Sequence, residues 1–299
     1  MIGATTTYGF IGLGQMGHGM AKNIRQKIPA NNTLIIYDIN VEAMKQFISD
    51  YGREANIWAA SSPREVAEHA DIIMTSVLKP NRKILFLELS TIDAKVSSEV
   101  AHRVTTGGYG DFVDALCSGG AMGAEAGTLS FMIGSPDHLY PRVLEICKLV
   151  GKESGIFHCG NLGAGLQTKL LNNYLSSLTA LATAEVMNIG IRSGLDAFKL
   201  NEVINASSGM SFNSKVNNPV PGLTPNAPPS KGYKGGFSIE LCLGVLELGV
   251  KAAKDLGAKT VLGGPMLEAF TEASTVDEYK GKDSKIIYKW LGGQDPVLS

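Results

Sequence analysis

The stretch GFIGLGQMGHGMAKNI, residues 9–24, decides the fold of this chain. It joins a short apolar run, Tyr8–Ile11, to a helical pattern that continues to about Gln26. The turn between them has the spacing G-x-G-x-x-G, over Gly12, Leu13, Gly14, Gln15, Met16 and Gly17. In such a turn the first glycine permits a tight bend, the second lets backbone approach a pyrophosphate, and the third lets the helix pack on the strand. The helix N-terminus adds partial positive charge, so we expect a dinucleotide site here.

A carboxylate lies at the position where a dinucleotide-binding domain binds the ribose of the adenosine. Asp38 closes the next predicted strand, Leu34–Tyr37, at the usual distance of about 20 residues from the glycines. There it would accept hydrogen bonds from the adenosine ribose and repel a 2′-phosphate, which favours NAD over NADP. Asp38 is also a candidate N-cap for the helix that begins at Val41, and the two roles are compatible.

Strand and helix patterns alternate through the first half of the chain, which predicts an α/β fold with a doubly wound parallel sheet. Further strands are expected at 57–60, 72–78 and 84–89, and at DFVDAL (111–116) and LSFMIG (129–134) around a Gly/Ala-rich loop. Helices are expected at Val41–Tyr51 and at Pro63–His69, the second capped by Ser61 or Ser62.

The joint between the strands at 72–78 and 84–89 is too short for this scheme. Only Lys79–Lys83 separates them, whereas a parallel crossover needs about a dozen residues. Either the connection is unusually short, or a stretch of the natural chain is absent from this sequence. The undisturbed pattern on both sides favours the second interpretation.

The second half of the chain is predicted to be helical. A long helix is expected over Ala164–Arg192, and no strand pattern follows about residue 160. We therefore place one α/β domain at 1–160 and one all-helical domain at 161–299.

Composition excludes several classes of protein. The formal net charge of −1 and pI near 6.5 provide no basic surface for nucleic acid. No apolar run reaches the length of about 18 residues that spans a membrane, and the N-terminus enters a strand pattern without a leader. No metal-binding cluster or disulfide framework is visible in the five histidines or in Cys117, Cys147, Cys159 and Cys242. We expect a soluble intracellular protein, or the processed form of an imported one.

Two further patterns suggest a site for a small acid. Ser118, Gly119 and Gly120 follow a predicted strand, and their backbone N–H groups could hold a carboxylate, although an ordinary turn explains the tripeptide equally well. Lys169 and Asn173 stand four residues apart on one face of the long helix. A buried lysine there could exchange a proton with a substrate oxygen, whereas most helical lysines are solvated surface charges.

Taken in order, these motifs resemble the β-hydroxyacid dehydrogenase family. The resemblance is carried by GFIGLGQMGHGMAKNI, LSTID (89–93), DALCSGGAMGAEAGTLSFMIG (114–134) and GAGLQTKLLNNYL (163–175). The segments SSGMSFNSKVNNPVPGLTPNAPPSKGYKGGF (207–237) and DEYKGKDSKIIYKWL (277–291) are similar to 3-hydroxyisobutyrate dehydrogenases in particular. The resemblance covers nearly the whole chain and implies a Rossmann-type domain followed by a helical domain.

The resemblance also implies the site residues. The cofactor-binding set would be Gly12, Leu13, Gly14, Gln15, Met16, Gly17, Asp38, Val77, Leu78, Thr91 and Phe237. Ser118, Gly119 and Gly120 would hold the substrate carboxylate. Lys169 would be the general acid/base, and Asn173 would orient the substrate beside it. The implied reaction is the NAD-dependent oxidation of 3-hydroxyisobutyrate to methylmalonate semialdehyde in valine breakdown. It implies a homodimer or homotetramer, placed in the mitochondrial matrix if the source is eukaryotic and otherwise in the cytoplasm.

Three departures from the family pattern keep other interpretations open. Leu116 and Cys117 replace Pro and Val, the joint at Lys79–Lys83 is short, and Gly244 stands where the family has a cofactor-contacting lysine. Lys254 lies about ten residues too late to match that lysine, although it or Lys251 would reach if the helix were shifted. The alternatives are a dehydrogenase for 3-hydroxypropionate or tartronate semialdehyde, an imine reductase, and a catalytically dead scaffold. Imine reductases generally lack the lysine that is present here as Lys169.

Overall fold

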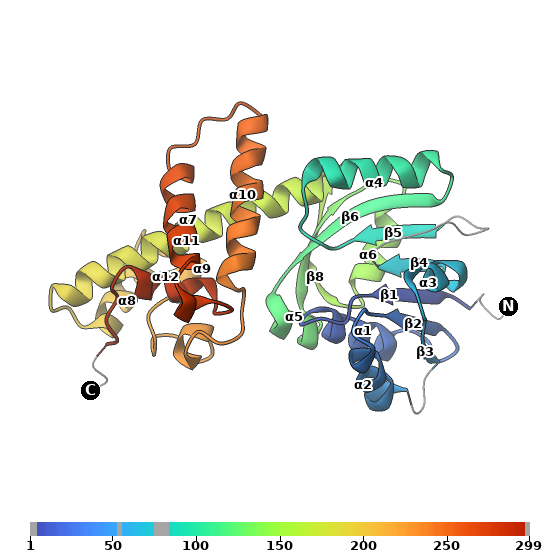
Figure 1. The fold of residues 1–299 in the computed structure, drawn as a ribbon, viewed down its shortest axis with the longest axis horizontal. Coiled ribbons are helices and arrows are strands. Elements are labelled where there is room, and N and C mark those ends of the chain that lie inside the picture. The colour runs from blue at the N-terminus through green and yellow to red at the C-terminus, as the bar shows by residue number, and fades with distance from the viewer. Residues whose placement is uncertain (1–4, 53–55, 75–83, 297–299) are drawn as a thin grey trace. The chain divides into compact units, whose positions relative to one another are not determined.

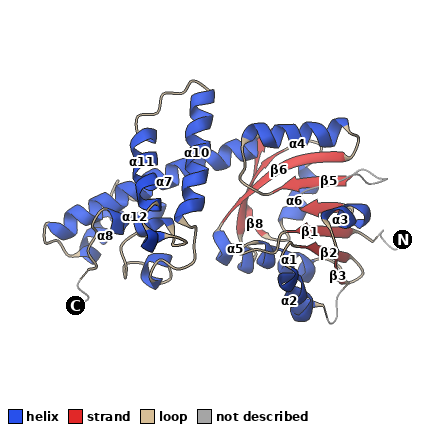
Figure 2. Cartoon of the chain, viewed as in Figure 1, coloured by secondary structure: helices blue, strands red, loops and turns tan. Residues whose placement is uncertain are grey.

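The computed structural model describes residues 5–52, 56–74 and 84–296. The chain divides into two compact units, Met1–Lys169 and Leu170–Ser299. The division falls inside the long helix α7 (Ala164–Arg192), whose bounds are those predicted from the sequence. Figure 2 shows strands in the first unit, while the described part of the second unit contains helices and loops.

The first unit is built on one eight-stranded sheet, visible in Figure 1, with the strand order β3-β2-β1-β4-β5-β6-β7-β8. The strands are β1 (Thr7–Ile11), β2 (Thr33–Tyr37), β3 (Ile57–Ala59), β4 (Ile72–Met74), β5 (Ile84–Glu88), β6 (Gly110–Ser118), β7 (Leu129–Gly134) and β8 (Gly151–Gly160). The order reverses between β1 and β4, which is the arrangement of a doubly wound sheet. The predicted fold class is confirmed, with one correction: β7 runs antiparallel to β6, so the sheet is not wholly parallel.

Helices cover both faces of this sheet because its strands are apolar on both sides. The helices are α1 (Gly17–Lys27), α2 (Val41–Tyr51), α3 (Pro63–His69), α4 (Ala94–Thr106), α5 (Gly120–Ala126) and α6 (Tyr140–Cys147). Alternate residues of β2 show the division: Leu34 and Ile36 pack into the core under α1, α2, α5 and α6, and Ile35 into the core under α3 and α4.

Four elements of the first unit were not predicted from the sequence, namely α4, α5, α6 and β8. The Gly/Ala-rich segment after Ser118, expected to be a loop, forms α5, which packs against α1. Gly19 makes this approach possible, because a Cβ there would lie 2.7 Å from the backbone nitrogen of Glu125. The strand β8 was not predicted, since most of its residues are polar or exposed and Ile156 is its main core residue.

The short joint gives a mixed result. β4 and β5 pair in parallel, with Ile72 opposite Leu85, as expected of neighbouring strands in this fold. The residues between them, 75–83, lie outside the described part of the chain, and so does the end of the predicted strand 72–78.

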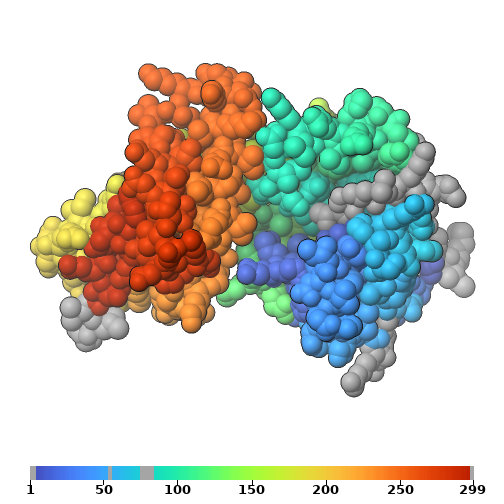
Figure 3. All heavy atoms as spheres, viewed as in Figure 1, coloured from blue at the N-terminus to red at the C-terminus, as the bar shows by residue number. Residues whose placement is uncertain are grey.

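The second unit packs its helices around a separate core. Its elements are the remainder of α7, α8 (Ala197–Ala206), α9 (Phe212–Lys215), η1 (Pro228–Lys231), α10 (Ile239–Asp255), α11 (Gly263–Ser274), η2 (Asp277–Tyr279), η3 (Ser284–Ile286) and α12 (Ile287–Trp290). Figures 1 and 3 show α10, α11 and the C-terminal turns side by side. Met187, Leu246, Phe270 and Tyr288 are buried among them. No helix within the described ranges has both the length and the hydropathy needed to cross a bilayer.

Candidate active site

The glycine-rich turn leaves β1 and enters α1 in the form that a dinucleotide requires. Gly12 has φ +99°, a conformation that favours glycine. A Cβ on Gly17 would lie 1.8 Å from the carbonyl oxygen of Gly12, so helix and strand meet there with no room for a side chain. A Cβ on Gly14 would meet nothing within 4 Å, so the backbone at Gly14 faces open space. This bare surface fits a pyrophosphate.

Asp38 lies beside this turn. Its Oδ2 accepts a hydrogen bond of 2.5 Å from the backbone N–H of Leu13, and its Oδ1 one of 2.7 Å from that of Asn40. The alternative role of Asp38 as a helix N-cap is wrong, because the side chain of Asn40 accepts the bonds from the first turn of α2. Asp38 therefore has its carboxylate fixed next to the glycines.

Several predicted residues lie at one edge of the sheet. β1, β2, β4, β5 and β6 run parallel in the sheet, so their carboxyl ends share an edge. Gly12, Asp38 and Thr91 each follow one of these ends, and Ser118 is the last residue of β6. In open α/β sheets this edge, at the reversal of strand order, is where ligands bind. Val77 and Leu78 were predicted for the same edge, but they lie outside the described residues.

The tripeptide at the end of β6 has an unusual backbone. Gly119 and Gly120 have φ +133° and +64°, and both are exposed. A Cβ on Gly120 would meet nothing within 4 Å, so the backbone there is bare. The ordinary alternative, a tight turn that only connects two strands, does not apply, because Gly119 is the N-cap of α5.

Lys169 is buried and is not a solvated surface charge. Only 9% of its surface is exposed. Burial lowers the pKa of its ammonium below the ordinary value of 10.5, and the neighbouring Cys117 opposes the shift. The same burial raises the pKa of the Cys117 thiol. Because Cys117 precedes Ser118, Lys169 lies close to the end of β6, and its pKa is shifted in the direction that a proton carrier needs.

Asp114 fixes the helix that carries this lysine, and sequence reasoning gave it no role. Its Oδ1 accepts a hydrogen bond of 2.7 Å from the N–H of Gly163, and its Oδ2 one of 2.8 Å from that of Leu166. The carboxylate is fully buried, and Gly134 makes room for it, since a Cβ there would lie 2.4 Å from Oδ1. The only sequence signal was an acid in an otherwise apolar strand.

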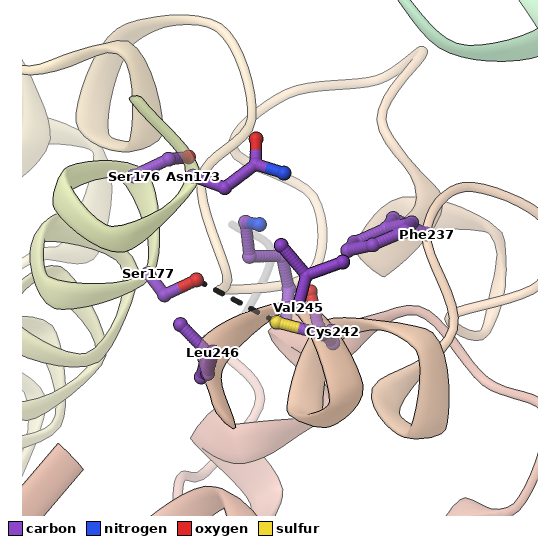
Figure 4. A pocket seen from close by; sticks show the side chains of 9 residues that line it. Asn173, Ser176, Ser177, Phe237, Cys242, Val245 and Leu246 are labelled. Carbon is purple, nitrogen blue, oxygen red and sulfur yellow. Dashed lines mark hydrogen bonds between the residues drawn. The ribbon is translucent and has the colours of Figure 1, made fainter. Parts of the chain in front are cut away.

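The second unit has a small pocket, shown in Figure 4. Asn173 reaches it from α7, while Cys242, Val245 and Leu246 line it from α10. Phe237 stands at its rim, with 40% of its surface exposed. Asn173 and Phe237, which the sequence linked only through family resemblance, thus share one pocket. Ser176, Ser177, Ser284 and Lys285 complete the lining.

The two α10 lysines considered in place of the family lysine at Gly244, Lys251 and Lys254, do not line this pocket. Lys251 is bound to Asp255, with Nζ and Oδ2 3.0 Å apart. Lys285 from η3 does line it. Sequence reasoning missed Lys285, which is one of several lysines in a polar segment and has no local signature.

Comparison with known proteins gives one consistent result. Residues 7–84 and 81–163 match the family model described as the NAD binding domain of 6-phosphogluconate dehydrogenase. Residues 163–291 match the model described as the NAD-binding domain of NADP-dependent 3-hydroxyisobutyrate dehydrogenase. The first match breaks at residues 81–84, where the sequence showed its short joint.

Individual relatives agree with the family models. The mitochondrial 3-hydroxyisobutyrate dehydrogenase of Mus musculus is 36% identical over 97% of this chain and 88% of its own length. The enzyme of Homo sapiens is 34% identical over the same shares. Among solved structures, the 3-hydroxyisobutyrate dehydrogenase of Mycobacterium tuberculosis with L-serine superposes with a TM-score of 0.84 at 27% identity, covering 96% of this chain and 99% of that one.

Proposed function

This chain belongs to the β-hydroxyacid dehydrogenase family, and from that premise we propose that it is an NAD-dependent 3-hydroxyisobutyrate dehydrogenase. It would oxidise the 3-hydroxyl of its substrate to an aldehyde, giving methylmalonate semialdehyde. The chemistry depends on Lys169, a buried lysine with a lowered pKa beside the end of β6.

The proposed roles follow from the chemistry of each group. Lys169 accepts the proton of the substrate hydroxyl during oxidation and returns it during reduction. Bound NAD would supply the acceptor for the hydride of C3. The side-chain amide of Asn173, four residues on along α7, hydrogen-bonds the substrate and fixes the direction of its hydroxyl. Ser118, Gly119 and Gly120 offer one hydroxyl and bare backbone N–H groups to the carboxylate.

The cofactor would be held by the first unit. Gly12–Gly17 receive the pyrophosphate, and Asp38 exchanges its bond to Leu13 for the adenosine ribose hydroxyls. The carboxylate repels a 2′-phosphate, which supports NAD over NADP even though one matching family is described as NADP-dependent. Thr91, Phe237, Val77 and Leu78 are proposed to contact the nicotinamide half.

Formation of reduced nicotinamide, followed by absorbance with 3-hydroxyisobutyrate as substrate, tests this function. NADP replaces NAD in one parallel assay, and 3-hydroxypropionate replaces the substrate in another. Lys169→Met should lower kcat by about 10²–10⁴-fold, while NAD binding stays intact. Lys152→Met, an exposed lysine of the same unit, is the matched control. Absence of turnover with any 3-hydroxy acid, from folded protein that binds NAD, would favour the dead scaffold.

Assembly and compartment belong to the same proposal. We propose a homodimer or homotetramer, because Leu171, Leu175, Val186 and Ile189 of α7 expose between 47% and 64% of their surfaces along one stripe. Light scattering on purified protein measures the assembly. Because the mouse and human relatives are named mitochondrial, we propose the matrix for a eukaryotic source and the cytoplasm otherwise, which cell fractionation tests.

A further inference from the structure

The part of α7 that belongs to the second unit is apolar on two opposite faces. One face enters the core, where Ala184 and Met187 are fully buried. The other face is exposed, and its large apolar residues are Leu171, Leu175, Val186 and Ile189. Between residues 170 and 191 the helix has one charged residue, Glu185. A solvated helix face normally carries several charges, whereas a helix that is apolar all round is buried all round. The exposed face of α7 thus has the composition of a covered one.

The exposed apolar positions have symmetric spacing along the helix. Six positions, each three or four residues from the next, lie within about 80° of the helix circumference. This α7 seam consists of Leu171, Leu175, Leu178, Ala182, Val186 and Ile189. Taken as the pairs 171 with 189, 175 with 186 and 178 with 182, they share one midpoint next to Ala180. Spacings of three and four are those of helices packed side by side. In a two-fold contact each residue and its counterpart exchange places, and the α7 seam meets that condition when a second copy runs in the opposite direction.

The single charge beside the α7 seam favours this antiparallel direction. Glu185 is exposed and lies at the edge of the seam. In a parallel pair it would face Glu185 of the partner subunit, and facing like charges are unfavourable. In an antiparallel pair centred on Ala180 it lies opposite Leu175 and Ser176 of the partner subunit. The two Glu185 positions are then roughly 14 Å apart along the helix axis, at 1.5 Å per residue, which exceeds the Debye length of about 8 Å at physiological salt.

The α7 seam has the size of the centre of an interface. From Leu171 to Ile189 it extends about 27 Å, and a helix about 10 Å wide offers roughly 300 Å² over that length. A standard interface buries about 800 Å² on each partner, with an apolar centre and a polar rim. The seam would supply the apolar centre, and the surface on both sides of α7 would supply the rim.

We propose that the α7 seam packs against the α7 seam of a second copy of this chain, antiparallel, around a two-fold axis next to Ala180. This rests on the proposed function only for the existence of an assembly, and it requires no contact between the two units of one chain. Asn173 and Ser177, which line the pocket of the second unit, lie on the opposite side of α7. The contact therefore leaves that pocket open.

Opposite charges introduced at Leu175 test the direction of packing. Leu175→Glu places a carboxylate opposite Glu185 of the partner subunit, whereas Leu175→Lys places an ammonium there. The dissociation constant of the assembly, measured by sedimentation equilibrium, should therefore rise at least about tenfold more in Leu175→Glu than in Leu175→Lys. Leu256→Glu, at an exposed position after α10, is the control and should leave the constant unchanged. Equal weakening by both charges, or weakening by neither, would overturn the antiparallel contact.

Cysteine cross-linking tests the register. An equal mixture of Leu171→Cys and Ile189→Cys should give a covalent dimer under mild oxidation, while each variant alone should not, because its two copies lie about 27 Å apart. Wild type, oxidised in the same way, controls for Cys117, Cys147, Cys159 and Cys242. Self-linking of each single variant would show a parallel pair and overturn the assignment.

Both measurements are independent of catalysis. An inactive protein that cross-links as expected would overturn the dehydrogenase and leave the contact standing. An active dehydrogenase assembled through another surface would do the reverse. A monomeric wild type would assign the α7 seam to a different protein or to a membrane surface, and it too would overturn the proposal.

Discussion

The carboxylate of Asp114 accepts a hydrogen bond of 2.8 Å from the backbone N–H of Leu166. This bond joins the strand that ends in Ser118 to the helix that carries Lys169, three residues after Leu166. Gly165 permits the approach, because a Cβ there would lie 2.4 Å from the carbonyl oxygen of Met132. The proposed carboxylate site and the proposed base are therefore held in register by one buried acid.

Asp114→Asn should weaken this joint. The amide keeps one acceptor oxygen and turns an NH₂ group toward a backbone donor, so we expect a loss of about 1–3 kcal/mol in the free energy of unfolding. Because Lys169 would be less well positioned, kcat should fall by at least tenfold while KM for NAD is little changed. Urea denaturation and steady-state kinetics measure the two effects. Asp111→Asn on the same strand is the control. Equal effects in both variants would contradict a specific role of the hydrogen bonds that Asp114 accepts from α7 and the residue before it.

The pH dependence of catalysis should follow Lys169. Oxidation needs the neutral amine, so kcat/KM for the hydroxy acid should rise with pH through the pKa of Lys169 and level off above it. Burial lowers that pKa below the ordinary value of 10.5, so the midpoint of the rise should lie below pH 10.5. Reduction of the aldehyde needs the ammonium, and its rate should fall with pH through the same pKa. Profiles recorded with substrate deuterated at C3 isolate hydride transfer, and parallel slopes in the two directions would exclude Lys169 as the proton carrier.

The glycines of the turn should separate folding from cofactor binding. Gly14→Ala should keep its stability and lose at least about tenfold in NAD affinity, because its methyl group would occupy the open space that the pyrophosphate approaches. Gly17→Ala should lose both, because its methyl group would collide with the carbonyl oxygen of Gly12. Thermal unfolding and fluorescence titration with NADH distinguish the two variants. A Gly14→Ala protein with normal NADH affinity would place the cofactor elsewhere.

Asp38 should decide between the two nicotinamide cofactors. Asp38→Ser removes the charge that repels a 2′-phosphate, so the ratio of kcat/KM for NAD to that for NADP should fall at least tenfold. Asp50→Ser, at an exposed position of α2, is the control for loss of one negative charge. An unchanged ratio would show that another residue sets the preference.

The elements whose cause is local follow from the amino-acid sequence alone. Gly12 and Gly17 form the turn because backbone conformation and close packing exclude side chains there. Apolar periodicity gave α2, α3 and α7 with their observed bounds. The resemblance of motifs along nearly the whole chain to a known family indicated that family and the candidate site residues.

Which groups are buried, and which groups they contact, depends on the three-dimensional packing of the chain. Asp114 caps a helix about 50 residues away, α5 forms because Gly19 lets it pack on α1, and β8 depends on pairing with β7. Lys285 is one lysine among several in the sequence, and only packing places it in the lining of a pocket with Asn173. Burial and charge pairing depend on contacts between distant parts of the chain, and no local pattern records them.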